Sequence, residues 1–333
     1  MNLTRFPRQN FSAGTTPIEK LETLSEKLGG PNIYVKRDDM YGTFSPGGNK
    51  TRKLEFLLGE ALELGANAII TCGAVQSNHC RLTIAASVKL GLECHLVLEE
   101  RVPGSYKEDA SGNNLHYRLL GAKSIKVVKG GADLLAHMNE ISETLKAQGK
   151  TSYIIPTGGS NPVGALGYAA CALEIMQQLF EMNIKMDYIV LTSGSSGTHA
   201  GMLVGMHAIN GGIPIVGISI SRKADLQKEN VNRLCISTAN KIGLQSVPKA
   251  DDIIVYSDYV GGGYSIPTDG MVDAVKLLAT TEALILDPVY TGKTMHGLID
   301  LIKKGVFKKG ENVLFLHTGG STALYAYKEQ FGL

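Results

Sequence analysis

The stretch AIITCGAVQSNHCRLTIAASVKLGLECHLVLE, residues 68–99, decides the fold of this chain. It opens with the short β-branched run AIITCG and passes through a polar loop into a segment of helical period, HCRLTIAASVKLG. A second β-branched run, CHLVLE, closes it. Two short apolar runs that flank a segment of helical period predict a βαβ unit with parallel strands.

The same alternation extends in both directions from this unit. Before it stand IYVK and TRKLEFLLGEALELG. After it come SIKVVKG, a helical segment over 134–147, YIIPTGG, a helical segment over 163–181, YIVLTSG, IPIVGISIS, DIIVYSD and NVLFLHTGG. The pattern predicts an α/β protein whose parallel, twisted sheets are covered by helices on both faces. Ligands of such folds bind beyond the carboxyl ends of the strands, in loops such as TCGAVQSNH, PTGGSN, TSGSSGTHAG and LHTGGST.

Length and charge limit the classes of function. A chain of 333 residues is long enough for two domains with a cleft between them. The 33 Lys and Arg residues nearly balance the 31 Asp and Glu residues, so no strong positive field favours nucleic acid or an anionic membrane surface. We therefore expect a small-molecule substrate, no nucleic-acid partner and no membrane association.

The cysteines and the amino terminus indicate the compartment. The five cysteines form no CxxC pair and no zinc-binding spacing with histidine, which predicts free thiols and no metal site. No apolar segment follows Arg5 and Arg8, and no later stretch approaches the apolar length of a membrane span. We expect a cytoplasmic protein.

The loop TSGSSGTHAG follows the apolar run YIVL and precedes a helical segment. Backbone N–H groups, the hydroxyls of Ser195, Ser196 and Thr198, and a helix dipole meet there, which suits a phosphate dianion. The alternatives are a turn whose glycines only allow close helix packing and a dinucleotide site. Gly194-Ser-Ser-Gly197 is not the GxGxxG fingerprint, and ISISRK lacks the acidic residue that binds a ribose, so a single phosphate fits better.

In FSPGGNKTRKLEFLL, Gly47 and Gly48 precede Lys50 at the start of a helical segment. Burial, the positive end of the helix, and the neighbours Arg52 and Lys53 would lower the pKa of Lys50 and favour a nucleophilic amine. The alternative is an ordinary surface lysine in a first turn. Such a lysine has no need of the flexible Gly-Gly approach, which favours a reactive Lys50.

The segment AVQSNHC lies between a predicted strand and a predicted helix. The N–H groups of Ser77, Asn78 and His79 are expected to point outward at the helix start, where they can hold an amino-acid carboxylate. Ser77 could instead serve only as the helix N-cap.

The chain contains six motifs in this order: GGNKTRKLEF, GAVQSNH, PTGGSNPVGALGY, SGSSGTHAG, DPVYTGK and LHTGG. Together they resemble the D-cysteine desulfhydrase and 1-aminocyclopropane-1-carboxylate deaminase family of fold-type II pyridoxal-phosphate (PLP) enzymes. The resemblance implies a two-domain, tryptophan-synthase-beta-like fold, with a large PLP-binding domain over 1–47 and 161–333 and a small inserted domain over 48–160. It also implies a homodimer.

The resemblance assigns roles to individual positions. Lys50 would be the Schiff-base lysine, Asn78 would contact the PLP hydroxyl, and the loop from Ser195 to Thr198 would hold the phosphate. It implies catalytic roles for Lys50, Ser77, Tyr264 and Tyr290, cofactor contacts from Lys50, Lys53, Asn78, Ser195, Ser196, Gly197, Thr198, Thr291 and Thr318, and substrate contacts from Ser77, Asn78, His79 and Gly159. Each tyrosine alone could be a core ring. Many relatives have proline at the position of Gly263, before Tyr264.

Two positions separate the branches of the family. The family resemblance implies that the cyclopropane deaminases carry Glu and Leu where this chain has Thr291 and Thr318. The two threonines are similar to the desulfhydrase branch, so the resemblance implies α,β-elimination of D-cysteine to hydrogen sulfide, pyruvate and ammonia. Thr291 could also merely cap the following helix. Cyclopropane deaminase or L-cysteate lyase activity, a catalytically silent PLP-binding protein, and an NADP-dependent reductase using Arg222 are the alternatives.

Overall fold

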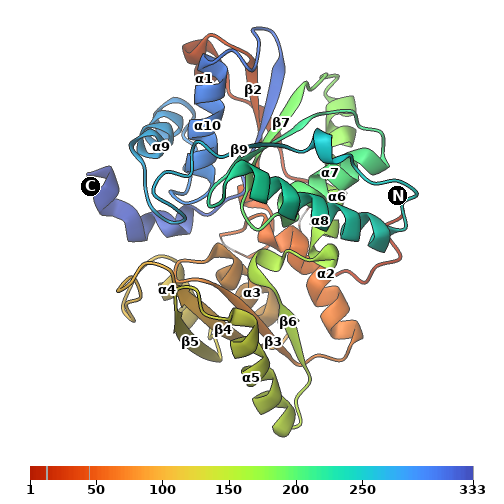
Figure 1. The fold of residues 1–333 in the computed structure, drawn as a ribbon, viewed down its shortest axis with the longest axis vertical. Helices are drawn as coiled ribbons and strands as arrows, with labels where there is room; N and C mark the ends of the chain where they lie inside the picture. Colours follow the sequence, from red (N-terminus) through yellow and green to blue (C-terminus); the bar gives the residue numbers. More distant parts are fainter. Residues whose placement is uncertain (13, 45, 333) are drawn as a thin grey trace.

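The computed structural model describes residues 1–12, 14–44 and 46–332, and within these residues ten strands form two sheets flanked by helices (Figure 1). This arrangement confirms the predicted α/β class.

The larger sheet has the strand order β1-β2-β10-β7-β8-β9. Its strands are β1 (Ile18–Lys20), β2 (Asn32–Lys36), β7 (Tyr188–Ser193), β8 (Ile215–Ser219), β9 (Ile254–Tyr256) and β10 (Asn312–Leu316). All pairs are parallel except the edge pair β1 and β2, in which Ile18 lies opposite Lys36. The sequence did not predict β1, because three residues carry too little periodicity to indicate a strand.

The smaller sheet is parallel throughout, with the order β5-β4-β3-β6. Its strands are β3 (Ala68–Ala74), β4 (Glu93–Glu100), β5 (Ser124–Lys129) and β6 (Ser152–Ile155). The stretch 68–99 forms β3, α3 and β4, and Ala68 lies opposite Glu93 in the register. The predicted βαβ unit is therefore confirmed.

The helices connect the strands on both faces of the sheets. The α-helices are α1 (Glu22–Leu28), α2 (Lys50–Glu63), α3 (Asn78–Lys89), α4 (Asn113–Leu119), α5 (Leu134–Ala147), α6 (Pro162–Glu181), α7 (Gly197–Ala208), α8 (Ala224–Ile242), α9 (Asp269–Glu282) and α10 (Thr291–Lys303). Short 3-10 segments are η1 (Asp38–Met40), η2 (Thr157–Gly159), η3 (Ala250–Asp252) and η4 (Ser321–Phe331).

Strand β7 shows how the larger sheet is buried. Ile189 and Leu191 belong to the core shared with α6, α7 and α8, whereas Val190 belongs to the core shared with α1, α9 and α10. Alternate side chains of a strand point to opposite faces, so an uninterrupted apolar run requires cover on both. Figure 1 shows these two groups of helices on either side of the sheet.

Helix α6 corrects one expectation from the sequence. Its 20 residues are long and apolar enough to cross a membrane by length and composition, although no stretch was expected to approach that length. However, 61% of its apolar window is buried inside the protein. Gly167 and Gly201 bring α6 against α2 and α7, since a Cβ at Gly167 would lie 2.2 Å from the Arg52 carbonyl oxygen. This burial is typical of a core helix.

The strands of the smaller sheet fall within 68–155, inside the range predicted for the inserted domain. Helix α2, assigned to the same domain, also packs against α6, which follows the smaller sheet in the chain. The division at residues 47/48 and 160/161 stays a prediction.

Candidate active site

A pocket lies where the carboxyl ends of strands from both sheets meet. All four loops expected to face a ligand contribute to its wall. The predicted site residues that line it are Lys50, Ser77, Asn78, His79, Ser195, Ser196, Thr198, Tyr264, Tyr290 and Thr318. Lys53, Gly159, Gly197 and Thr291 lie outside this lining.

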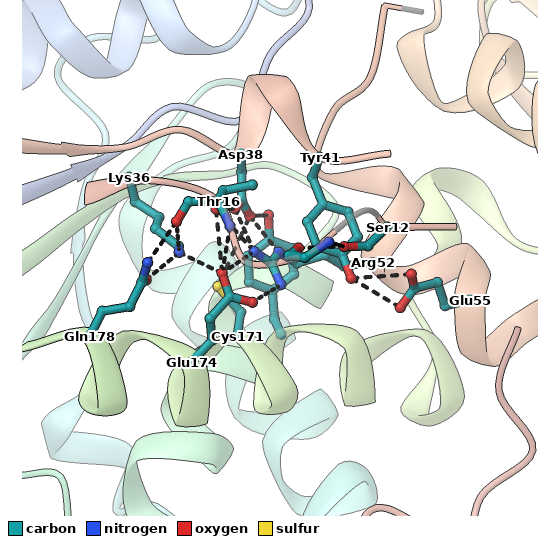
Figure 2. Close-up of polar contacts among 12 residues, drawn as sticks. Ser12, Thr16, Lys36, Asp38, Tyr41, Arg52, Glu55, Cys171, Glu174 and Gln178 are labelled. Atoms are coloured by element: carbon teal, nitrogen blue, oxygen red, sulfur yellow. Dashed lines mark hydrogen bonds and ion pairs between the residues drawn. The ribbon is translucent and has the colours of Figure 1, made fainter. Parts of the chain in front are cut away.

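Helix α2, which begins at Lys50, is held by a buried charged network (Figure 2). Arg52 pairs with Asp38 at 2.8 Å and with Glu174 of α6 at 2.7 Å, and its guanidinium lies 3.9 Å from the centre of the Tyr41 ring. Burial alone would raise the pKa of Asp38, but the charge and hydrogen bonds of Arg52, with the charge of Lys36 and the hydrogen bond from Tyr168, together outweigh it and the pKa is lowered. The start of α2 is thereby fixed between the larger sheet and α6.

The chain enters α2 through a conformation that requires glycine. Gly48 has φ +149°, and a Cβ there would lie 3.2 Å from Leu82. Asn49 then donates its backbone N–H to the Thr318 carbonyl across 3.1 Å. Burial lowers the pKa of Lys50 to about 8, opposed by a contact with Lys53. A neutral, nucleophilic amine is therefore accessible near neutral pH through burial, as predicted. The expectation that Lys53 would also lower this pKa was wrong, because the contact with Lys53 raises it.

Lys53 lies behind the pocket wall. Its Nζ donates to the Gly158 carbonyl at 3.1 Å and to Ser160 Oγ at 3.2 Å. Burial, together with the charge of Lys50, lowers the pKa of Lys53 well below its usual value. Lys53 thus supports the η2 loop in this structure, and its predicted cofactor contact stays a prediction.

Gly158 brings the η2 loop close to both Lys50 and the SGSSGT loop. A Cβ at Gly158 would lie 2.3 Å from Ser195 Oγ and 3.6 Å from Lys50 Nζ, and its φ is +66°. Ser195 Oγ also lies 2.8 Å from Ser160 Oγ. Only glycine allows these side chains to approach one another here.

The start of α7 presents backbone donors for which the described residues offer no acceptor. Within the described residues, no hydrogen bond is formed by the backbone N–H groups of Ser195, Ser196 and Thr198. Ser196 adopts φ +71°, and Gln227 and Asn49 donate to the hydroxyls of Ser196 and Thr198 at 3.3 Å. Unpaired amides, two serine hydroxyls and a helix N-terminus fit a phosphate group.

The NH groups before α3 correct part of the sequence interpretation. The Ser77 N–H does not face the pocket, because it donates to the Tyr117 hydroxyl at 2.7 Å. Ser77 Oγ caps α3 by accepting from the Cys80 N–H at 3.1 Å, and Ser77 also lines the pocket. Since that bond uses only the oxygen, the hydroxyl hydrogen remains able to donate to a ligand. No acceptor within the described chain takes the amides of Asn78 and His79.

His79 is neutral. Thr71 donates its single hydroxyl hydrogen to the Ile155 carbonyl at 2.9 Å, so the 2.8 Å contact between Thr71 and His79 requires the proton on Nε2. Burial, then the charges of Lys50 and Lys53, lower the pKa of His79 well below its usual value. Gly159 stands beside the His79 ring, where a Cβ would lie 3.5 Å from Cε1.

The two predicted tyrosines meet in the pocket. The hydroxyls of Tyr264 and Tyr290 are hydrogen-bonded, and the rings are edge-to-face with centroids 5.9 Å apart. Arg101 lies over the Tyr264 ring, 4.3 Å from its centre, and Glu99 holds the Arg101 Nε at 2.5 Å. Burial raises the pKa of Tyr264, and the charge of Arg101 opposes that rise.

The loop before Tyr264 has Gly263 where the family resemblance led us to expect proline. Gly263 has φ +141°, a conformation that proline cannot adopt. Lys293 of α10 donates to the carbonyls of Val260 and Gly263 at 2.7 and 2.8 Å, which holds the loop against the helix. Tyr264 is therefore positioned by Lys293 in this chain.

Of the two positions that separate the branches, Thr318 lines the pocket and Thr291 does not. Thr291 donates its hydroxyl to Asp287 Oδ1 at 2.7 Å and accepts the Asp287 N–H at 2.8 Å. Asp287 also accepts the N–H groups of Val289 and Tyr290, at 2.9 Å each. The expected contact of Thr291 with the cofactor ring stays a prediction.

Two arginines also line the pocket wall: Arg101, which the sequence did not indicate, and Arg222, which it indicated only for the NADP-reductase alternative. Arg101 follows β4, and Arg222, which donates to the Gly194 carbonyl at 2.9 Å, follows β8. Both stand beyond the carboxyl end of a parallel strand, and this position in the sequence could have indicated them.

The fold and the site together define a class. A buried lysine of lowered pKa stands beside a cradle of unpaired amides, a combination that fits an aldehyde cofactor carrying a phosphate. A family model described as pyridoxal-phosphate-dependent enzyme matches residues 10–319. The chain belongs to this family of pyridoxal-phosphate-dependent enzymes, which confirms the predicted cofactor and excludes the NADP-reductase interpretation of Arg222.

Curated relatives are similar along nearly the whole chain. The D-cysteine desulfhydrase of Salmonella typhimurium is 43% identical over 328 residues, which is 98% of each chain. The D-cysteine desulfhydrase of Klebsiella pneumoniae subsp. pneumoniae is 44% identical over the same share of each chain. These relatives confirm the family resemblance seen in the six motifs.

Solved structures confirm the fold. An ACC deaminase homologue, 38% identical, aligns with a TM-score of 0.88 over 99% of this chain and 96% of its own. An O-ureido-L-serine synthase, 17% identical, aligns with a TM-score of 0.65 over 96% of this chain and 94% of its own. The tryptophan-synthase-beta-like, fold-type II architecture predicted from the sequence is thus correct.

Proposed function

We propose that this protein eliminates hydrogen sulfide from D-cysteine, leaving pyruvate and ammonia. The observation that carries the proposal is the 43–44% identity, over 98% of the chain, to proteins named D-cysteine desulfhydrase. The pocket supplies the residues that this reaction needs.

Lys50 is the residue we assign to proton removal. In the elimination the Cα–H and Cβ–S bonds break, a double bond forms between Cα and Cβ, and the resulting enamine hydrolyses to pyruvate and ammonia. Bound pyridoxal phosphate supplies the electron sink that makes the Cα–H bond acidic. With a pKa of about 8, Lys50 would hold the cofactor aldehyde through its neutral amine and, once the amino group of the substrate has displaced it, would accept the Cα proton as a free amine.

The tyrosine pair is suited to the departing sulfur. The hydrogen bond between Tyr264 and Tyr290 leaves one hydroxyl hydrogen available to a third group. Arg101 over the Tyr264 ring favours transient negative charge on the phenol oxygen, so a proton can pass to the leaving hydrosulfide. The Ser77 hydroxyl and the amides of Asn78 and His79 can hold the substrate carboxylate.

One observation favours a second candidate, lyase activity on a β-sulfonated substrate such as cysteate. Arg101 and Arg222 both line the pocket, and burial, followed by the charge of Arg101, lowers the pKa of Arg222. Two guanidinium groups at one pocket suit a β-substituent that carries a fixed negative charge.

The products of the purified enzyme decide among the candidates. We expect D-cysteine to give hydrosulfide and pyruvate in equal amounts, with much less from L-cysteine. Sulfite from cysteate, or 2-oxobutyrate from 1-aminocyclopropane-1-carboxylate, at higher kcat/KM would contradict the proposal. A borohydride-trapped cofactor adduct with no product from any of these substrates would indicate a silent PLP-binding protein.

We also propose a cytoplasmic homodimer, without membrane association. The family resemblance supports the dimer. The five buried cysteines, Cys72, Cys80, Cys94, Cys171 and Cys235, support a reducing compartment, since none is in a disulfide in the described structure. Light scattering of the holoenzyme tests the dimer, and fractionation of the source cells tests the compartment.

A further inference from the structure

Arg81 is a buried cation that has no carboxylate partner in the described part of the chain. It lies on α3, is 1% exposed, and appears in no ion pair among the described residues. Burial lowers its pKa to about 10, so the guanidinium stays charged at neutral pH. Its recorded acceptors are Asn113 Oδ1, 2.8 Å from Nε, and the Pro46 carbonyl, bound by Nη1. Burying an unpaired guanidinium costs folding free energy, so we expect this arginine to serve a function besides packing.

The chemistry of Arg81 fixes the orientation of the Asn113 amide. A guanidinium only donates, so the Asn113 oxygen must face Arg81 and the nitrogen must point away. Asn113 Nδ2 then donates to the Gln76 carbonyl at 3.1 Å and to Asn78 Oδ1 at 2.9 Å. A backbone carbonyl only accepts, so Gln76 imposes the same orientation independently.

The orientation of Asn113 in turn fixes Asn78. Because Asn113 presents its nitrogen, Asn78 must present its oxygen to Asn113 and its own nitrogen to the other side. That nitrogen lies beside Gly320, where a Cβ would approach it to 2.7 Å. No protein acceptor binds Asn78 Nδ2 in the described residues, and Asn78 lines the pocket.

We propose that Arg81 and Asn113 are positioning residues that force Asn78 to present a hydrogen-bond donor to the ring oxygen of the bound cofactor. Arg81 at the same time holds the Pro46 carbonyl, four residues before Lys50. The relay thus aligns both the ring-oxygen donor and the entry to α2. The inference rests on the cofactor role of Asn78 in the proposed function, and it does not depend on D-cysteine being the substrate.

The substitution Asn113→Asp tests the relay because aspartate keeps the size of asparagine but only accepts hydrogen bonds. The introduced carboxylate would still accept from Arg81 and would gain an ion pair, which offsets the lost bond to the Gln76 carbonyl. Asn78 would have to reverse, turning its oxygen toward the cofactor ring oxygen. We expect about 10- to 100-fold weaker cofactor binding, as for a lost hydrogen bond to a charged group. The unfolding temperature of the apoprotein should change by no more than about 4 °C.

The matched control is Asn114→Asp, the same chemical change at the next residue. Asn114 is buried on α4 and donates to the Lys107 carbonyl at 3.3 Å, and its side chain forms no hydrogen bond with Arg81, Asn113 or Asn78 among the described residues. Its cofactor affinity and the visible absorption maximum of its bound cofactor should match those of the parent. The absorption maximum of Asn113→Asp should shift in the same direction as that of Asn78→Ala, which removes the donor outright.

Arg81→Met provides a second route, since it removes the donor to both Asn113 and the Pro46 carbonyl without adding a charge, and leaves the Gln76 carbonyl alone to orient Asn113. We expect its cofactor affinity to fall severalfold, with the same direction of spectral shift. Parent-like affinity and spectrum in both Asn113→Asp and Arg81→Met, while Asn78→Ala is impaired, would overturn the relay. A parent-like Asn78→Ala would overturn its premise. Either result leaves the hydrosulfide assay free to support or refute the substrate.

Discussion

The hydroxyl of Thr291 forms hydrogen bonds with both the carboxylate and the backbone N–H of Asp287. Thr291 donates to Asp287 Oδ1 at 2.7 Å, while its oxygen accepts the Asp287 N–H at 2.8 Å. Both side chains are fully buried, and the same carboxylate holds the N–H of Tyr290. Burial raises the pKa of Asp287, against the lowering effect of these hydrogen bonds. The residue at position 291 is therefore coupled to the placement of Tyr290.

We expect the double substitution Thr291→Glu with Thr318→Leu to move activity toward ring opening. A glutamate beside Asp287 places two buried carboxylates together, so one must hold a proton at neutral pH and can share it with a neighbouring acceptor. The kcat/KM for D-cysteine should fall at least tenfold, and 2-oxobutyrate should appear from 1-aminocyclopropane-1-carboxylate. The control is Thr280→Glu, which adds a carboxylate at an exposed position of α9. An unchanged substrate preference would remove these positions as determinants.

Gly158→Ala should weaken cofactor binding at least tenfold. Its Cβ would enter the space of Ser195 Oγ and displace the loop that presents the unpaired amides. Gly149→Ala separates this clash from backbone strain, because Gly149 has a similar φ of +75° but no atom within 4 Å of the added carbon. Equilibrium titration of both apoproteins with cofactor measures the effect. Equal affinities for the two variants would refute the steric role of Gly158.

Tyr264→Phe and Tyr290→Phe should each lower kcat by about a hundredfold or more, the usual contribution of a positioned proton donor. The edge-to-face packing of the rings survives both changes, so KM for D-cysteine and the unfolding temperature should move little. Initial rates against D-cysteine over a range of pH test this. A variant that lost affinity rather than turnover would indicate a packing role.

Lys50→Met should stabilise the apoprotein at pH 7. Because burial lowers the pKa of Lys50 to about 8 in the folded state, the fold disfavours the charged amine that the unfolded chain carries up to its ordinary pKa of 10.5. Stability from this group therefore rises as pH increases from about 8 to 10.5, where the unfolded chain binds more protons. The difference in unfolding temperature between variant and parent should shrink over this range. A difference in unfolding temperature that stays constant over this pH range would indicate that the Lys50 amine is exposed to solvent.

The sequence predicted the βαβ units and the convergence of four loops, because each loop's position after an apolar strand fixes its edge of the sheet. It could not predict that the Ser77 N–H would be taken by Tyr117, which lies 40 residues further along the chain. Nor could it place Thr291 outside the pocket lining, since that depends on the turn that Asp287 caps. Arg81 and Asn113 stand at ordinary helical positions, and only their mutual contact indicates a role.

The most direct test of the account is the assay of parent and Lys50→Ala with D-cysteine, with hydrosulfide and pyruvate measured together. We expect equal amounts of both products from the parent enzyme. The variant should lose about a hundredfold to ten-thousandfold of that rate or more, the usual contribution of a general base. Near-normal turnover by the Lys50→Ala variant, or hydrosulfide without pyruvate from the parent, would contradict it.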